Sequence, residues 1–158
     1  MISLLQRVTQ AQVEVDSVVV GAIGAGLLVL VGVEPDDTPA QSDRLLDRIL
    51  GYRVFPDSDG RMNCSLAETG GGLLLVPQFT LAADTRKGAR PSFATAAPPE
   101  LGERLFDYLV SQAVSRHANT KQGRFGAHML VSLVNDGPVT FSLTARAATP
   151  RPRHRDNP

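Results

Sequence analysis

The chain has 158 residues and a formal net charge of zero, with 42% apolar and 20% charged residues. This composition predicts one soluble domain with a buried core, and it excludes full disorder, a collagen-like repeat and a disulfide scaffold. The single cysteine, Cys64, is typical of a reducing cytoplasm. The longest apolar run, residues 22–33, is shorter than the ~20 residues of a spanning helix, so we expect a cytoplasmic protein with no membrane partner.

Predicted strands cluster toward the two ends of the chain. β-prone, alternating or apolar stretches in the N-terminal part predict four strands, at residues 2–8, 12–15, 18–23 and 26–33. Further apolar runs predict three more strands, at residues 73–76, 127–134 and 139–143. The last two of these are separated by an Asn-Asp-Gly-Pro turn.

Two main helices are predicted between these strands. Thr38 and Gln41 form a Thr-x-x-Gln capping box around Pro39, which predicts a helix that runs to about Arg53. A second helix is expected from the Pro-Pro-Glu at residues 98–100 to about residue 117. Because strands and helices do not alternate regularly, the order favours a single α+β domain with a mostly antiparallel, barrel-like sheet.

The C-terminal segment, residues 145–158, holds four arginines against one aspartate and contains three prolines. Such a composition predicts a disordered tail that follows a domain at residues 1–144. The arginines are either solvated or in contact with a phosphate backbone. The rest of the chain is acidic, which argues against broad binding of duplex nucleic acid, and we expect no DNA partner.

Most catalytic and cofactor motifs are missing from the sequence. It contains no Cys-x-x-Cys, His-Glu-x-x-His or phosphate-binding Gly-rich loop, and its three histidines are scattered. We therefore expect no metal and no cofactor.

A first candidate site follows the predicted strand at residues 73–76. Gln78 offers an amide and Thr80 a hydroxyl at a strand end, where scaffolds present polar groups to ligands. The alternative is an ordinary sheet edge at which Thr80 only satisfies a turn. A basic loop follows, which is either solvated or binds the phosphates of a polyanion, and its basic residues are Arg86, Lys87 and Arg90.

A second candidate site is the Asn-Asp-Gly-Pro-Val-Thr segment at residues 135–140. By itself this segment is typical of a tight hairpin turn. Pro138 is a candidate for a cis peptide bond, and Gly137 carries no side chain. A stiff backbone of this kind suits a site that discriminates ligands by shape.

Together the two segments resemble the signature of the D-aminoacyl-tRNA deacylases, which carry Ser-Gln-Phe-Thr and Asn-x-Gly-Pro-x-Thr motifs. The second motif is complete here, and the first reads Pro-Gln-Phe-Thr at residues 77–80. The similarity spans roughly residues 1–144. It includes flanking stretches at residues 5–8, 24–30, 60–63, 80–84, 90–93 and 123–125.

This resemblance implies hydrolysis of the ester that joins a D-amino acid to the terminal adenosine of tRNA, by a homodimer with two sites at the subunit interface. Gly137 and Pro138 would form a cis dipeptide that enters the partner's pocket and holds the substrate's α-amino group. An L-amino acid would clash with this wall, whereas a D-amino acid or glycine would fit. Arg7 resembles the family arginine that orients the Gly-Pro loop.

The resemblance also implies roles for the first motif. An aminoacyl ester is already activated, so the Gln78 segment would mainly position it, with the backbone N–H groups of Phe79 and Thr80 stabilising the oxyanion. No base in the sequence activates the Thr80 hydroxyl as a nucleophile, which favours a positioning role.

Two further sets of residues have implied or inferred contacts with the tRNA. Phe125 and Met129 would line the adenosine pocket, and the alternative for both is core packing. Arg86, Lys87 and Arg90 are expected, from charge, to meet acceptor-stem phosphates.

Pro77 departs from the family pattern because it replaces a serine and so removes a hydroxyl and a backbone N–H. We expect the change to be tolerated if only the strand end and the donors at Phe79 and Thr80 matter. The alternatives are a binder of tRNA ends that has lost its activity and a Thr80-dependent hydrolase of small esters.

Overall fold

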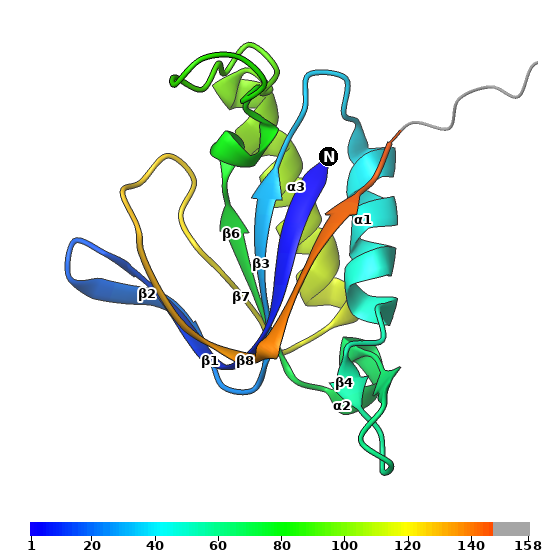
Figure 1. The fold of residues 1–158 in the computed structure, drawn as a ribbon. Coiled ribbons are helices and arrows are strands. Elements are labelled where there is room, and N and C mark those ends of the chain that lie inside the picture. The colour runs from blue at the N-terminus through cyan, green and yellow to red at the C-terminus, as the bar shows by residue number, and fades with distance from the viewer. Residues whose placement is uncertain (147–158) are drawn as a thin grey trace, which may run out of the picture.

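Two parallel strands, β3 (Gly26–Gly32) and β6 (Gly72–Pro77), form the centre of the main sheet and are covered on both faces. The structure is a computed structural model that describes residues 1–146 (Figure 1). Strands covered on both faces are apolar at nearly every position. This explains why both read as continuous apolar runs rather than as alternating patterns.

The remaining strands extend this centre into a nearly closed, mixed sheet. The sheet order is β2-β1-β3-β6-β7, and β8 pairs with β1 on its other edge. The bounds of these strands are β1 Ile2–Val15, β2 Val18–Ile23, β7 Thr120–Gln122 and β8 Leu130–Thr144. The β3–β6 and β6–β7 pairs are parallel, and the pairs made by β1 are antiparallel.

The helices α1 (Pro39–Gly51) and α3 (Pro99–Arg116) pack against one face of the central strands and form the larger core cluster. The smaller cluster lies on the opposite face, where β1, β2 and β8 curl over β3 and β6. Short elements complete the chain. They are a hairpin of β4 (Phe55–Pro56) and β5 (Met62–Cys64), the single turn α2 (Leu66–Thr69) and the 3-10 helix η1 (Phe79–Ala82).

The prediction of an α+β domain with two main helices is confirmed. The capping box is also confirmed, since the Gln41 side chain accepts a hydrogen bond of 2.9 Å from the Thr38 backbone N–H. The short elements β4, β5, α2, η1 and β7 were not predicted. Each has four residues or fewer, too few to establish a hydrophobic period.

The predicted strand breaks in β1 and β8 were wrong. Residues 2–15 form one strand, because β8 runs beside nearly all of it and bulges absorb the irregular residues near Val8. The Asn-Asp-Gly-Pro segment lies in the middle of β8 rather than in a turn between two strands.

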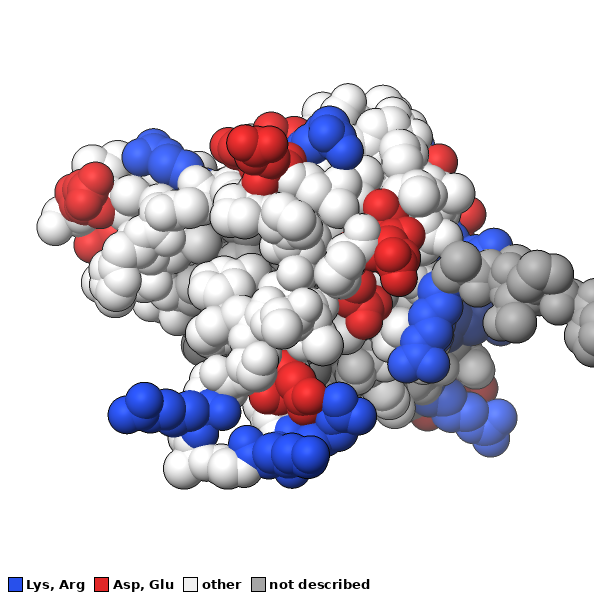
Figure 2. Space-filling view, turned by 90° about the horizontal axis from the view of Figure 1, so that it is seen from above, with Lys and Arg blue, Asp and Glu red and all other residues white. Residues whose placement is uncertain are grey.

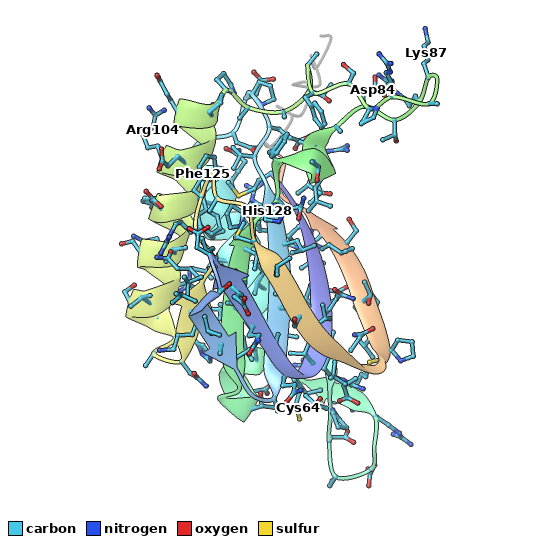
Figure 3. The ribbon with its side chains drawn as sticks, turned by 90° about the vertical axis from the view of Figure 1, so that its left-hand side faces the viewer. Cys64, Asp84, Lys87, Arg104, Phe125 and His128 are labelled. Carbon is cyan, nitrogen blue, oxygen red and sulfur yellow. The ribbon has the colours of Figure 1, made fainter. Side chains whose placement is uncertain are left out.

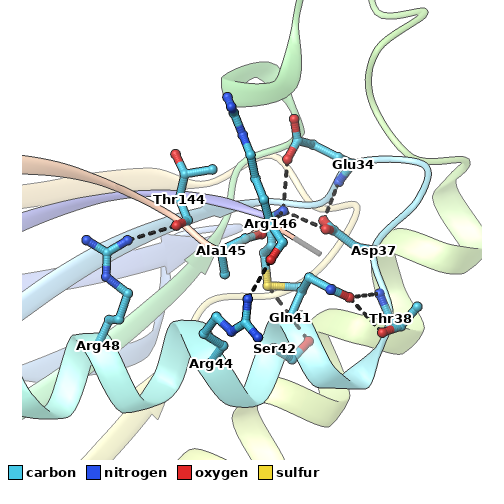
Figure 4. A network of polar contacts seen from close by, with 11 residues as sticks. Glu34, Asp37, Thr38, Gln41, Ser42, Arg44, Arg48, Thr144, Ala145 and Arg146 are labelled. Carbon is cyan, nitrogen blue, oxygen red and sulfur yellow. Dashed lines mark hydrogen bonds and ion pairs between the residues drawn. The ribbon is translucent and has the colours of Figure 1, made fainter. Parts of the chain in front are cut away.

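The N-terminal ammonium group of Met1 is buried and joins three parts of the chain (Figure 4). It donates to the Asp37 carboxylate at 2.5 Å, to Glu34 at 2.8 Å and to the Ala145 carbonyl at 3.0 Å. Arg44 and Arg48 of α1 donate to backbone carbonyls at and just beyond the end of β8. The rest of the predicted tail, residues 147–158, lies outside the described residues.

We predict that Asp37→Ala lowers the free energy of unfolding by about 3 kcal/mol, because it leaves a buried cation with one carboxylate partner that is partly exposed. Urea denaturation measures the change. Asp36→Ala, at the exposed neighbouring position, is the control and should change stability by less than about 0.5 kcal/mol. Equal effects of the two variants would contradict the importance of the buried pair.

Candidate functional site

A cavity of about 440 Å³ opens where β3 and β6 end, between η1, the start of α3 and the loop that precedes β8. The carboxyl ends of parallel strands are a common place for ligands in sheets of this kind. Four of the residues predicted for the site line this cavity, and they are Gln78, Phe79, Phe125 and Met129. Phe125 and His128 lie below the loop that carries Lys87 in Figure 3.

Most of the cavity wall is apolar, and part of it belongs to the core. Phe125 packs against the larger core cluster and against α3, where a Cβ on Gly102 would lie 3.3 Å from the Phe125 ring. The Met129 sulfur packs at the smaller cluster and accepts a hydrogen bond from the Arg124 backbone N–H at 3.4 Å. Each of these two residues therefore both packs in the core and lines the cavity.

Pro77 occupies an open edge of β6, which explains why the fold tolerates it. In the parallel ladder the neighbouring Gln78 N–H donates to the Val31 carbonyl at 2.7 Å, so the backbone nitrogen of Pro77 faces away from β3. On that far side β7 has already ended, and a Cβ on Gly123 would lie 3.4 Å from the proline Cδ. The ring therefore replaces an N–H that faces no strand.

The side chains of Gln78 and Thr80 form a hydrogen bond with each other at the mouth of the cavity. The Gln78 amide donates a hydrogen bond to the Thr80 hydroxyl oxygen. An amide N–H cannot accept the hydroxyl proton, and within the described residues no titratable side chain bonds to this hydroxyl. Thr80 therefore lacks the partner that an activated nucleophile needs. Phe79 and Thr80 begin η1, so their N–H groups have no acceptor inside that helix.

The Gly-Pro segment is held in place by side chains of its own motif and of β1. The Gly137–Pro138 bond is cis, as predicted. Arg7 Nε lies 3.1 Å from the Asp136 carboxylate and 3.3 Å from the Asp136 carbonyl. The Asn135 amide donates to the carbonyls of Arg7 and Val139, at 2.9 and 3.0 Å.

Gly137 is required by the backbone at this position. Its φ of 126° is strongly disfavoured for residues with a side chain. A Cβ there would lie 2.6 Å from Val139 Cγ2 and 3.1 Å from Arg7 Nη2. The motif therefore places an exposed stretch of backbone beside a fixed guanidinium group.

Within one chain the two motifs do not meet. The cavity lies near η1, at the top of the sheet in Figure 1, whereas the middle of β8 lies at the bottom. Gly137 and Pro138 do not line the cavity. Arg7 donates to the Val54 carbonyl at 2.6 Å and stays with the Gly-Pro segment.

The predicted basic loop projects from the same end of the molecule as the cavity. Figure 2, which views the molecule from this end, shows basic side chains gathered along its lower edge. The backbones of Asp84 and Ser92 close the loop through two hydrogen bonds of 2.8 and 3.0 Å. Arg86 pairs with Asp84 at 2.7 Å, and its hydrogen bonds lower the pKa of that carboxyl. The net positive charge of the loop therefore comes from Lys87 and Arg90.

The sequence reasoning missed two features of the cavity. His128 contributes an imidazole to its lining, and α3 contributes Gly102 and Phe106. The spacing of apolar residues in α3 indicated which face of the helix is buried, but it did not indicate which of its residues line a cavity. Among residues 1–146, no group of three His, Cys, Asp or Glu side chains is close enough to hold a metal ion, and no helix is long and apolar enough to cross a membrane.

Comparison with known sequences assigns the chain to a family. The model of the family described as D-Tyr-tRNA(Tyr) deacylase matches residues 4–144. A relative named D-aminoacyl-tRNA deacylase from Pseudomonas fluorescens is 67% identical over 140 residues, which cover 89% of this chain and 97% of the relative. A relative of the same name from Thioalkalivibrio sulfidiphilus is 68% identical over 143 residues, which cover 90% and 96%. The chain therefore belongs to the D-Tyr-tRNA(Tyr) deacylase family, as the motifs predicted.

Two solved structures share the fold. One is titled c-Myc DNA Unwinding Element Binding Protein, with a TM-score of 0.88, 37% identity, and coverage of 93% of this chain and all of that one. The other is titled a probable eukaryotic D-amino acid tRNA deacylase, with a TM-score of 0.78 and coverage of 90% and 97%. The latter is 18% identical, so its likeness concerns the fold alone.

We predict that Gly137→Ala lowers the free energy of unfolding by about 1–3 kcal/mol, because alanine is strained at this φ and its methyl group meets Val139 and Arg7. Gly51→Ala is the matched control. It lies at the end of α1 with nothing within 4 Å of the added Cβ, so it should not destabilise the protein. Urea denaturation of both variants tests the requirement, and an unchanged midpoint for Gly137→Ala would contradict it.

Proposed function

We propose that this protein hydrolyses the ester bond of D-aminoacyl-tRNA and releases a free D-amino acid and tRNA. Family membership and the two close relatives named D-aminoacyl-tRNA deacylase support a hydrolase that acts on this substrate. One observation carries the proposal. This chain has both features of the site: a Gly137–Pro138 segment held by Arg7, and a cavity bordered by the Gln-Phe-Thr motif. The cytoplasm is the compartment we propose.

The complete site would be formed by two copies of the chain. The cavity and the Gly-Pro segment lie at opposite ends of one subunit, so a substrate that touches both needs the segment from a partner. A homodimer would place two such sites at the interface. The carbonyl oxygens flanking Pro138 would then face the substrate's α-amino group.

Discrimination between enantiomers would come from the backbone rather than from a side chain. The fixed Gly-Pro wall would meet the side chain of an L-amino acid, whereas a D-amino acid would direct its side chain away. Glycine has no side chain to exclude, so glycyl-tRNA would be a second substrate. Arg7 and Asn135 would hold this wall in place, because their side chains donate hydrogen bonds to the carbonyls of Asp136 and Val139, on either side of Gly137 and Pro138.

Hydrolysis would rely on positioning and on electrostatic stabilisation. The aminoacyl ester is activated, and its neighbouring ribose hydroxyl can assist the reaction. The cavity would hold the terminal adenosine against Phe125 and Met129. The N–H groups of Phe79 and Thr80 would then stabilise the negative charge that develops on the carbonyl oxygen. Gln78 would fix the Thr80 side chain in a positioning role.

The first prediction from this function concerns rates. We expect the purified protein to hydrolyse D-tyrosyl-tRNA much faster than L-tyrosyl-tRNA, measured against a control without enzyme. Pro77→Ser should leave the rate within a few-fold, because Pro77 removes no bond of the sheet. If the wild-type protein hydrolyses neither ester and the Pro77→Ser variant hydrolyses the D-ester, the wild-type chain only binds tRNA ends.

The second prediction concerns chirality. Pro138→Ala should raise the rate on L-tyrosyl-tRNA relative to D-tyrosyl-tRNA by about 10-fold or more, since about 1.4 kcal/mol of lost exclusion has this effect. Pro56→Ala in the β4–β5 hairpin is the control and should keep the wild-type ratio. An unchanged ratio in a folded Pro138→Ala protein would count against the backbone wall. Sedimentation of the wild-type protein as a monomer would count against the two-chain site.

A further inference from the structure

Two phenylalanine rings lie in contact on the surface beside the mouth of the cavity. Phe79 is 56% exposed and Phe93 is 45% exposed, and their ring centroids are 5.1 Å apart at an interplanar angle of 55°. Phe79 lines the cavity, whereas Phe93 does not. The pair therefore extends an aromatic surface outward from the cavity, and we call Phe79 and Phe93 the aromatic pair.

The backbone that carries the aromatic pair is well anchored. Phe93 follows Ser92, whose backbone is bonded to Asp84. Beyond it, the Thr95 hydroxyl donates to the Ala82 carbonyl at 2.5 Å, and the Ala97 N–H donates to the Val33 carbonyl at 3.0 Å. Phe79 is fixed at the start of η1. The structure therefore holds two exposed apolar rings in place, where burial would have been favoured by the hydrophobic effect.

Positive charge lies immediately beyond the aromatic pair. Lys87 and Arg90 belong to the loop that leads into Phe93, and both are exposed. Lys87 lies at the far end of this loop in Figure 3. The order outward from the cavity is thus an apolar pocket, two aromatic rings and then a cationic loop.

This order matches the chemistry of an unpaired nucleic-acid strand. Proteins bind single strands by stacking bases on aromatic side chains and by placing cations along the backbone. We propose that the aromatic pair is a stacking site for the unpaired nucleotides that precede the terminal adenosine of tRNA. The proposal rests on the proposed function for its choice of RNA. It adds Phe93 as a residue that binds substrate outside the cavity and outside the reacting atoms.

The test uses the full chain and two uncharged RNA hairpins, one with an unpaired CCA tail and one cut back to a blunt end. Fluorescence anisotropy measures the two affinities. Phe93→Ala should weaken binding of the tailed hairpin by roughly 5- to 100-fold, the loss of one stacked base. It should leave binding of the blunt hairpin unchanged.

Two further substitutions at position 93 separate stacking from simple burial. Phe93→Tyr keeps an aromatic face and should bind the tailed hairpin within about 3-fold of wild type. Phe93→Leu keeps apolar volume without an aromatic face and should bind as weakly as Phe93→Ala. Val114→Ala, at a 51% exposed position of α3, is the control for the loss of an exposed apolar side chain and should have no effect.

The charged loop predicts a different signature. Lys87→Ala should weaken the tailed and blunt hairpins alike, and it should reduce the slope of log affinity against log salt by about 1. In the hydrolysis of D-tyrosyl-tRNA, Phe93→Ala should raise KM and leave kcat near the wild-type value, because stacking remote from the ester holds substrate and transition state equally.

The outcomes separate this proposal from the proposed function. Tail-dependent binding that needs Phe93, in a protein that hydrolyses neither ester, would support the stacking site and overturn the deacylase. Hydrolysis of the D-ester with equal binding of the tailed hairpin by wild type and Phe93→Ala would overturn the stacking site alone. A change in oligomeric state on Phe93→Ala, without a change in RNA affinity, would show that a second copy covers the aromatic pair.

Discussion

The covering of β3 and β6 on both faces is the constraint on which the rest of the structure depends. α1 and α3 cover one face of these two strands, and the curled strands cover the other. The space left at their carboxyl ends is the cavity. The segment that leaves β6 therefore passes the cavity directly, and this segment is the Gln-Phe-Thr motif. The motif is at the cavity because it directly follows β6 in the chain.

The long pairing of β1 with β8 has a different consequence for function. It carries the Gly-Pro segment in the middle of β8, where the side chains of Arg7 and Asn135 donate hydrogen bonds to the flanking carbonyls of Asp136 and Val139. Residues 136–139 have no partner in β1 and form a bulge that side chains hold in place. The segment does not line the subunit's own cavity. The Gly-Pro segment and the cavity therefore lie apart within one chain.

Local chemistry made much of this predictable from the sequence. The capping box of α1 and the apolar runs of β3 and β6 are short-range signals, and each was confirmed. The errors arose where pairing overrides local preference. The polar residues near Val8 suggested a break in β1, and Gly137 with Pro138 suggested a turn. In the structure β8 pairs with β1 on both sides of these residues, and the ladder is interrupted only locally, at residues 136–139 of β8. The motifs predicted candidate site residues, whereas their separation within the chain could come only from the topology. His128 carried no signal in the sequence, because its place at the cavity depends on how the loop before β8 folds back.

The buried ammonium group of Met1 bears on how the protein can be produced and labelled. It donates to three acceptors, and the Met1 side chain is itself fully buried. An affinity tag or fluorescent label joined to this nitrogen would turn a cation into a neutral amide and displace the end of β8 from its contact. Tags placed at the other end of the chain avoid this conflict, and reagents that acylate exposed amines should modify the lysines well before Met1.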